Sequence, residues 1–139
     1  MYRKSLFFYQ AMDENYSTKN FVDFLREFMD HLKAKNFERA IIIMDNVRFH
    51  HAEEVKTLVE SYGYEIWFIP PYSCFLNPIE NLFNQLKFYV KRLRPDSADK
   101  VFEAIELASQ VIGENDCQNY YKNMLKYIYK CLRKERIEN

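Results

Sequence analysis

The chain has 139 residues, of which 48% are hydrophobic and 17% aromatic. This length suits one domain, and this share of apolar side chains excludes an intrinsically disordered protein. The 20 basic and 20 acidic residues cancel, so any contact with nucleic acid must come from local basic clusters rather than from an overall positive field.

Cysteine usage and hydropathy indicate an intracellular protein. The three cysteines, Cys74, Cys117 and Cys131, are odd in number and lack the CxxC spacing of metal and redox motifs. No apolar run approaches the ~20 residues that span a bilayer, and the first ten residues lack the apolar stretch of a signal peptide. We therefore expect a protein with no membrane association, located in the nucleus if the organism is a eukaryote.

Strand and helix patterns alternate through the first half of the chain. The aromatic run at residues 5–10 predicts a strand. Apolar side chains at helical spacing from Phe21 to Leu32 predict a helix, with Ser17 or Thr18 as its cap. The β-branched run at residues 40–44 predicts a strand that is buried on both faces and ends at Asp45.

A second helix and a further strand follow. The spacing predicts a helix over residues 52–62, which Gly63 can end in a left-handed conformation. A strand at residues 65–69 stops where two prolines begin. This alternation is typical of an α/β sheet with its chemistry at the carboxyl ends of the strands, where Asp45 lies.

The last third of the chain is predicted to be entirely helical. At Asn77 a capping side chain is followed by a proline at the first helical position and a glutamate at the third, which predicts a helix to about residue 93. Apolar spacing predicts two more helices, at residues 98–112 and 117–133.

The candidate chemistry lies between residues 41 and 87. A buried strand ends in Asp45 and Asn46, with His50 a few residues on; the run IPPYS then leads through LNPIE, which ends at Glu80, into a helix. This pattern resembles the second half of the catalytic domain of mariner-type transposases, which belong to the DDE superfamily. The 34 residues between Asp45 and Glu80 match the interval between the second and third catalytic acids of those enzymes.

The resemblance extends over nearly the whole chain and implies its fold and activity. The implied fold is RNase H-like and truncated, with about three strands and an all-helical C-terminal third. Residues 1–139 would form one partial catalytic domain, with the core part at residues 1–95 and C-terminal helices at residues 96–139. The implied activity is metal-dependent DNA strand cleavage and transfer in transposition, with transposon ends and target DNA as partners and a homodimer as the expected assembly.

Asp45 and Glu80 are the predicted catalytic residues and metal ligands. Two Mg²⁺ or Mn²⁺ ions about 4 Å apart can serve an in-line displacement at phosphorus, and such hard cations prefer carboxylate oxygens. The expected neighbours of this site are Asn46, His50 and Asn77. The candidates for contacts to DNA phosphates are four basic residues that follow Glu80 along its helix: Lys87, Lys91, Arg92 and Arg94.

Simpler interpretations compete for the same residues. An aspartate after a strand is often only a turn former, and Glu80 can be a capping-box glutamate. A zinc site at His50 and His51 is disfavoured, because no cysteine or third histidine has ligand spacing. An aspartyl-phosphate enzyme with Asp45 as nucleophile is disfavoured too, because the DxDxT pattern is absent.

The family's first catalytic aspartate has no counterpart in the sequence. In the family it sits on the first strand, two strands before the one matched by residues 5–10. Asp13 is the nearest acid, but it aligns with a turn about 10 Å from that strand, and we do not accept it as the catalytic acid. Cys74 and Phe75 also replace the family's usual proline and acidic residue. We expect the chain alone to be inactive or weakly active; the alternative function is a non-catalytic DNA-binding or interaction module derived from a transposase.

Overall fold

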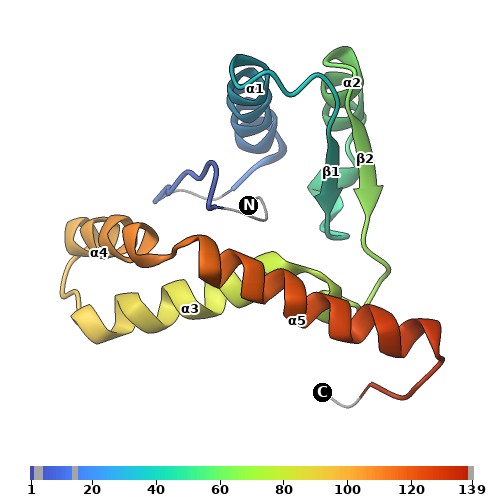
Figure 1. Ribbon diagram of the computed structural model, residues 1–139. Coiled ribbons are helices and arrows are strands. Elements are labelled where there is room, and N and C mark those ends of the chain that lie inside the picture. The colour runs from blue at the N-terminus through green and yellow to red at the C-terminus, as the bar shows by residue number, and fades with distance from the viewer. Residues whose placement is uncertain (2–4, 14–15, 138–139) are drawn as a thin grey trace. The chain divides into compact units, whose positions relative to one another are not determined.

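The computed structural model of the chain describes residues 1, 5–13 and 16–137, which form five α-helices and a two-stranded sheet (Figure 1). They divide into two compact units. The α/β unit comprises residues 14–73, and the helical unit comprises residues 1–13 and 74–139. Within the described ranges, no helix is both long and apolar enough to cross a membrane.

The α/β unit is built around two parallel strands (Figure 1). The strands are paired in register from Ile41 with Glu65 to Met44 with Phe68. The helix at residues 18–34 packs against the helix at residues 53–61, which forms the crossover between the two strands (Figure 1). The elements of this unit are α1 (Thr18–Ala34), β1 (Ile41–Met44), the short 3₁₀ helix η1 (Arg48–His51), α2 (Glu53–Ser61) and β2 (Glu65–Phe68).

Local sequence signals account for the ends of the two helices in this unit. Ser17 caps α1: its hydroxyl accepts from the Asn20 N–H at 3.2 Å, while its own N–H donates to the Asn20 side chain at 3.1 Å. This capping box satisfies backbone donors that the first helical turn leaves open. After α2, Gly63 takes a left-handed φ of 74°, which costs a glycine little.

The sheet is not covered on both faces, contrary to the prediction for residues 40–44. Met44 is buried, but Ile41 and Ile43 are 48% and 61% exposed, and Trp67, the register partner of Ile43, is 57% exposed. Side chains alternate between the faces of a strand, so one face carries the buried residues and the other is open. When every residue of a strand is aliphatic, its sequence does not tell whether one or both faces of the strand are covered.

The helical unit consists of three long helices. α3 (Pro78–Leu93) packs against both α4 (Ala98–Val111) and α5 (Glu114–Leu132), and the short 3₁₀ helix η2 (Cys74–Leu76) precedes α3 (Figure 1). The α5 helix begins at Glu114 rather than at the predicted residue 117. The core cluster of the helical unit contains four buried residues: Leu82, Ile112, Cys117 and Tyr120.

Residues 5–10 do not form the predicted strand. Ser5 makes an isolated bridge, residues 6–10 are irregular, and the sheet of the described residues has two strands rather than three. Leu6 instead packs against the core cluster of the helical unit, and the Ser109 hydroxyl donates to the Tyr9 hydroxyl at 2.9 Å. An aromatic run gains burial from helices as readily as from a sheet, and here the helices supply it.

Candidate functional site

Asp45 lies directly after the last residue of β1, where the strand prediction placed it. Its carboxylate oxygen Oδ1 accepts from the Val47 N–H at 3.3 Å and lies 2.8 Å from the His50 Nδ1 atom. The side chain is nevertheless 44% exposed. Asp45 therefore has a defined orientation and retains open coordination capacity, as a metal ligand requires.

His50 is the residue that orients Asp45. Its side chain is 15% exposed, and its ring lies 4.4 Å from the Phe21 ring and 4.7 Å from the Phe49 ring, measured between centroids. The Nδ1 atom also lies 3.3 Å from the Asp45 carbonyl oxygen. Because both polar neighbours of Nδ1 are oxygens, Nδ1 is assigned as the donor of this contact.

Asn46 braces the strand ends on which Asp45 sits. Its side-chain amide donates to the Ile69 carbonyl oxygen, and the Ile69 N–H donates to the Met44 carbonyl oxygen at 2.9 Å. These bonds connect the end of β1 with the residue that follows β2. Asn46 thus has a structural partner of its own and supports the position of its neighbour Asp45.

Glu80 stands in the first turn of α3, in the helical unit. The helix start is capped by Asn77, whose side-chain oxygen accepts from the Ile79 N–H at 3.4 Å. In a capping box Glu80 would accept from the Asn77 N–H, but that N–H donates to the Cys74 carbonyl oxygen at 2.9 Å instead. The Glu80 carboxylate makes no hydrogen bond or ion pair with any described residue, so the capping-box interpretation does not account for it.

The donor chemistry of Asp45 and Glu80 fits Mg²⁺ or Mn²⁺. Both offer carboxylate oxygens, and neither side chain is fully buried. They belong to different units, and among the described residues no group of three or more His, Cys, Asp or Glu side chains gathers to hold a metal. The residues present therefore fit part of a hard-cation site, with the other donors to be supplied from elsewhere.

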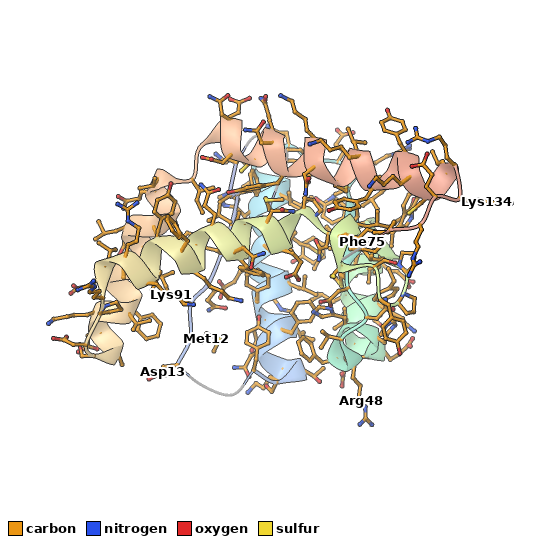
Figure 2. All side chains as sticks on the ribbon, turned by 90° about the horizontal axis from the view of Figure 1, so that it is seen from below. Met12, Asp13, Arg48, Phe75, Lys91 and Lys134 are labelled. Carbon is orange, nitrogen blue, oxygen red and sulfur yellow. The ribbon has the colours of Figure 1, made fainter. Side chains whose placement is uncertain are left out.

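The basic candidates are all exposed on α3 and at its C-terminal cap. Lys87 and Lys91 are four residues apart and share one helical face, and Figure 2 shows the Lys91 side chain on α3. Arg92 lies elsewhere on the helix, with its guanidinium 5.5 Å from the Phe88 ring centroid. Arg94 is the left-handed cap residue, with φ 49°. α3 thus presents several positive charges but not a single stripe.

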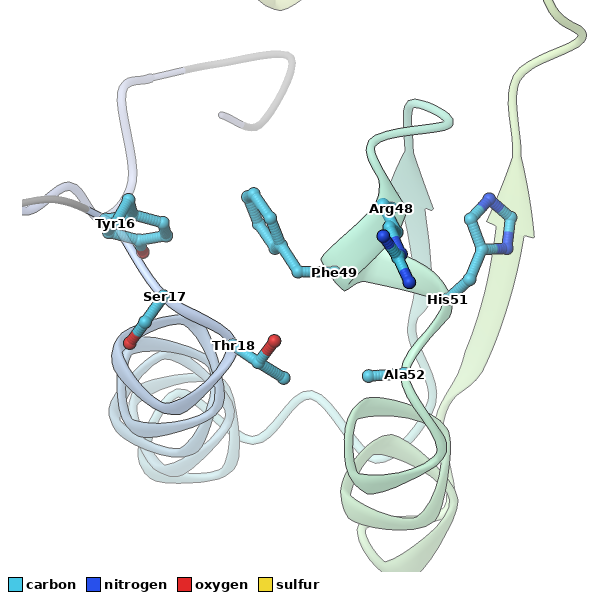
Figure 3. A pocket seen from close by; sticks show the side chains of 7 residues that line it. All are labelled: Tyr16, Ser17, Thr18, Arg48, Phe49, His51 and Ala52. Atoms are coloured by element: carbon cyan, nitrogen blue, oxygen red, sulfur yellow. The ribbon is translucent and has the colours of Figure 1, made fainter.

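A pocket beside η1 was not anticipated from the sequence. It has a volume of about 640 Å³ and lies within the α/β unit, with Tyr16, Arg48 and Phe49 among its lining residues (Figure 3). The signal that could have found it is the run VRFHH, in which basic and aromatic side chains fill the interval between Asn46 and the next helix.

Comparisons with known proteins bear on the family and the fold of the chain. The model of a family described as DDE superfamily endonuclease matches residues 1–101. Two solved structures of the Mos1 transposase catalytic domain with raltegravir, one with Mg and one with Mn, each share a TM-score of 0.84 and 19% identity with the chain; they cover 98% of this chain and 73% and 74% of theirs. The Mos1 mariner transposase catalytic domain alone gives a TM-score of 0.84 and 18% identity, with 98% and 72% covered.

The TM-scores of 0.84 show a shared fold, which confirms the predicted RNase H-like α/β fold class. A comparison with curated protein sequences returned no match.

Proposed function

Since the chain belongs to the DDE superfamily endonuclease family, we propose that it serves metal-dependent DNA strand cleavage and transfer in transposition, with Asp45 and Glu80 as two of the metal-binding acids. The observation that carries the proposal is the state of the Glu80 carboxylate. It stands at a helix start where a glutamate normally caps, yet its capping partner is occupied by another acceptor. A carboxylate on a rigid element that has no partner among the described residues is suited to bind a cation.

The side chains around Asp45 support a division of roles. A bound Mg²⁺ or Mn²⁺ ion supplies Lewis acidity for an in-line displacement at phosphorus. Asp45 and Glu80 would hold such ions through carboxylate oxygens. His50 keeps the Asp45 carboxylate in one orientation through the 2.8 Å contact, and Asn46 fixes the backbone from which it projects.

We also propose that residues 1–139 form only part of the catalytic domain. Two carboxylates bind a hard cation weakly, and in the described part of the chain no third acid joins either one. A further carboxylate from additional polypeptide would complete the site. DNA is the proposed substrate, with α3 basic residues such as Lys87 and Lys91 on its phosphates, and a homodimer is the proposed assembly.

Nicking of supercoiled DNA tests the site. The chain and a version extended at its N-terminus are assayed with Mg²⁺ or Mn²⁺, each against Asp45→Asn and Glu80→Gln. The matched controls are Asp23→Asn in α1 and Glu103→Gln in α4, which remove exposed carboxylates from the same two units. We expect cleavage by the extended protein, loss of about 1,000-fold or more with either site substitution, and no change with either control. Cleavage that survives both site substitutions would remove the assignment.

A second candidate function rests on the incomplete donor set. A chain whose described acids form no three-ligand cluster fits a DNA-binding or interaction module without catalysis. The same assay separates the two functions. If the extended protein binds DNA but does not nick it with Mg²⁺ or Mn²⁺, the non-catalytic function replaces the enzymatic one.

A further inference from the structure

The pocket beside η1 is open to solvent and is lined by aromatic and basic side chains, with Tyr16, Phe49 and Arg48 among them. Its volume of about 640 Å³ falls in the usual range for small-molecule sites, roughly 300–1,000 Å³. Figure 3 shows the Phe49 ring standing between Tyr16 on one wall and Arg48 and His51 on the other. The start of α1 and the η1 segment thus form the two sides of one open pocket.

The charge of the pocket favours an anion. Arg48 is exposed, extends away from the ribbon in Figure 2, and makes no ion pair with any described residue. The residues that line the pocket include no aspartate or glutamate. A guanidinium that is not neutralised locally suits the planar, two-point recognition of a phosphate.

The aromatic side chains of the pocket offer faces for stacking. Phe49 is held by Phe21, with ring centroids 5.3 Å apart and planes at 66°. Tyr16 lies 5.8 Å from Phe49, with planes at 54°, and is 43% exposed. One ring is therefore fixed and the other is accessible. Bases of single-stranded nucleic acid stack on such rings while basic groups hold the backbone.

The pocket adjoins the proposed metal ligand through η1. Arg48, Phe49 and His51 line it, while His50, from the same short helix, turns to the Asp45 carboxylate. We propose that the pocket binds one unstacked nucleotide of a DNA strand, with its phosphate on Arg48 and its base against Tyr16 and Phe49. The strand would then continue toward Asp45, whose partner His50 belongs to the same short helix as Arg48 and Phe49. This assignment rests on DNA as the substrate of the proposed function, but not on catalysis.

Binding without metal tests the pocket separately from the cleavage site. A fluorescein-labelled single-stranded oligonucleotide and its duplex are titrated with the full chain in EDTA, and anisotropy is recorded. Arg48→Gln is compared with Arg39→Gln, an exposed arginine of the same unit that does not line the pocket. We expect Arg48→Gln to weaken single-strand binding about tenfold and duplex binding less, and Arg39→Gln to weaken either by about twofold at most.

A pair of substitutions at Tyr16 tests stacking. Tyr16→Leu removes the ring, and Tyr16→Phe keeps it while removing the hydroxyl. We expect about a tenfold loss of single-strand affinity with leucine and nearly full affinity with phenylalanine. Circular dichroism of each variant verifies that the fold is retained.

Three results would each overturn the assignment. They are equal losses of affinity for Arg48→Gln and Arg39→Gln, equal losses for single strand and duplex, and equal losses for leucine and phenylalanine at position 16. This binding is measured in EDTA, so it needs no metal ion held by Asp45. Failure of the nicking assay with intact single-strand binding would therefore count against the catalytic proposal and not against the pocket.

Discussion

Asp45 in the α/β unit and Glu80 in the helical unit are held by different means. Asp45 is fixed by side-chain and backbone partners, with His50 and Val47 bonded to its carboxylate. Glu80 is placed only by its position in the first turn of α3, and its carboxylate has no described partner. The difference teaches that one acid is oriented by bonds to the residues that follow it in the chain, and the other is placed only by where a helix begins.

The largest expected effect concerns the core that supports Glu80. Leu82 is 1% exposed in the core cluster of the helical unit, so Leu82→Ala should lower the free energy of unfolding by about 2–5 kcal/mol. Urea denaturation is followed by circular dichroism and by fluorescence of Trp67, the single tryptophan, which lies in the α/β unit. A shift in both signals would show that the units unfold together, and a shift in circular dichroism alone that they unfold separately.

The matched control for that substitution is Leu132→Ala. Leu132 lies at the end of α5 and is 74% exposed, so its truncation should cost less than about 1 kcal/mol. A loss for Leu82→Ala no larger than this would contradict the core described for the helical unit.

The next effect concerns the support of Asp45. His50→Ala should lower metal-dependent nicking by the extended protein about 10- to 100-fold, because Asp45 loses the partner that orients it. His50→Asn places an amide donor near the position of Nδ1 and should recover part of the activity. Equal activity of His50→Ala and the unmodified protein would show that Asp45 needs no such partner.

Loss of a helix cap should have a smaller effect on the free energy of unfolding, and the effect should differ between the α/β unit and the helical unit. Ser17→Ala at the start of α1 should cost about 1 kcal/mol of unfolding free energy, because it breaks the reciprocal capping box. Asn77→Ala at the start of α3 should cost about half as much, since that cap is one bond of 3.4 Å. Urea denaturation of the two variants measures the difference, and a larger loss for Asn77→Ala would reverse the expected order.

The smallest effect is the pH dependence that Tyr120 gives to the stability of the helical unit. Burial, together with Asp116, raises the pKa of Tyr120 to about 12. Tyr120 also donates to the Gln85 side-chain oxygen at 2.7 Å. Since an unfolded tyrosine has a pKa of about 10, the stabilisation is complete below pH ~10 and is lost as the pH rises toward 12.

Tyr120→Phe should therefore flatten the fall in stability across that range. Unfolding by urea at a series of pH values, with and without the substitution, measures it. Parallel curves for the two proteins would show that Tyr120 does not couple to folding.

Sequence patterns predicted the helices and strands where local signals are strong. The β1–α2–β2 order and the start of α3 after Asn77 appear in the structure as predicted, and of the two predicted caps for α1, Ser17 or Thr18, the structure has Ser17. Side-chain caps specify α1 and α3 locally, and a run of β-branched residues specifies β1. The early start of α5 was missed because Asp116, whose carboxylate accepts from the Gly113 N–H at 3.0 Å, belongs to a residue type equally common in loops.

Features that depend on distant residues could not be predicted in this way. The irregular course of residues 5–10 follows from the packing of Leu6 on helices more than 70 residues later. The exposure of Ile43 and the pocket at Arg48 likewise depend on which surfaces the fold leaves open. For the candidate site, the sequence predicted Asp45, His50 and Glu80. The structure adds that the Asp45 carboxylate is hydrogen-bonded, whereas the Glu80 carboxylate has no partner among the described residues. Their joint action on a metal remains a prediction.

Binding of Mn²⁺, followed by electron paramagnetic resonance, tests the central claim that Asp45 and Glu80 serve one divalent-cation site. The extended protein is titrated alongside Asp45→Asn, Glu80→Gln and the double variant. If both carboxylates hold the same ions, each single substitution weakens binding, and the double variant loses clearly less than the two single losses combined. Additive losses, or Mn²⁺ affinity that neither substitution changes, would contradict the account.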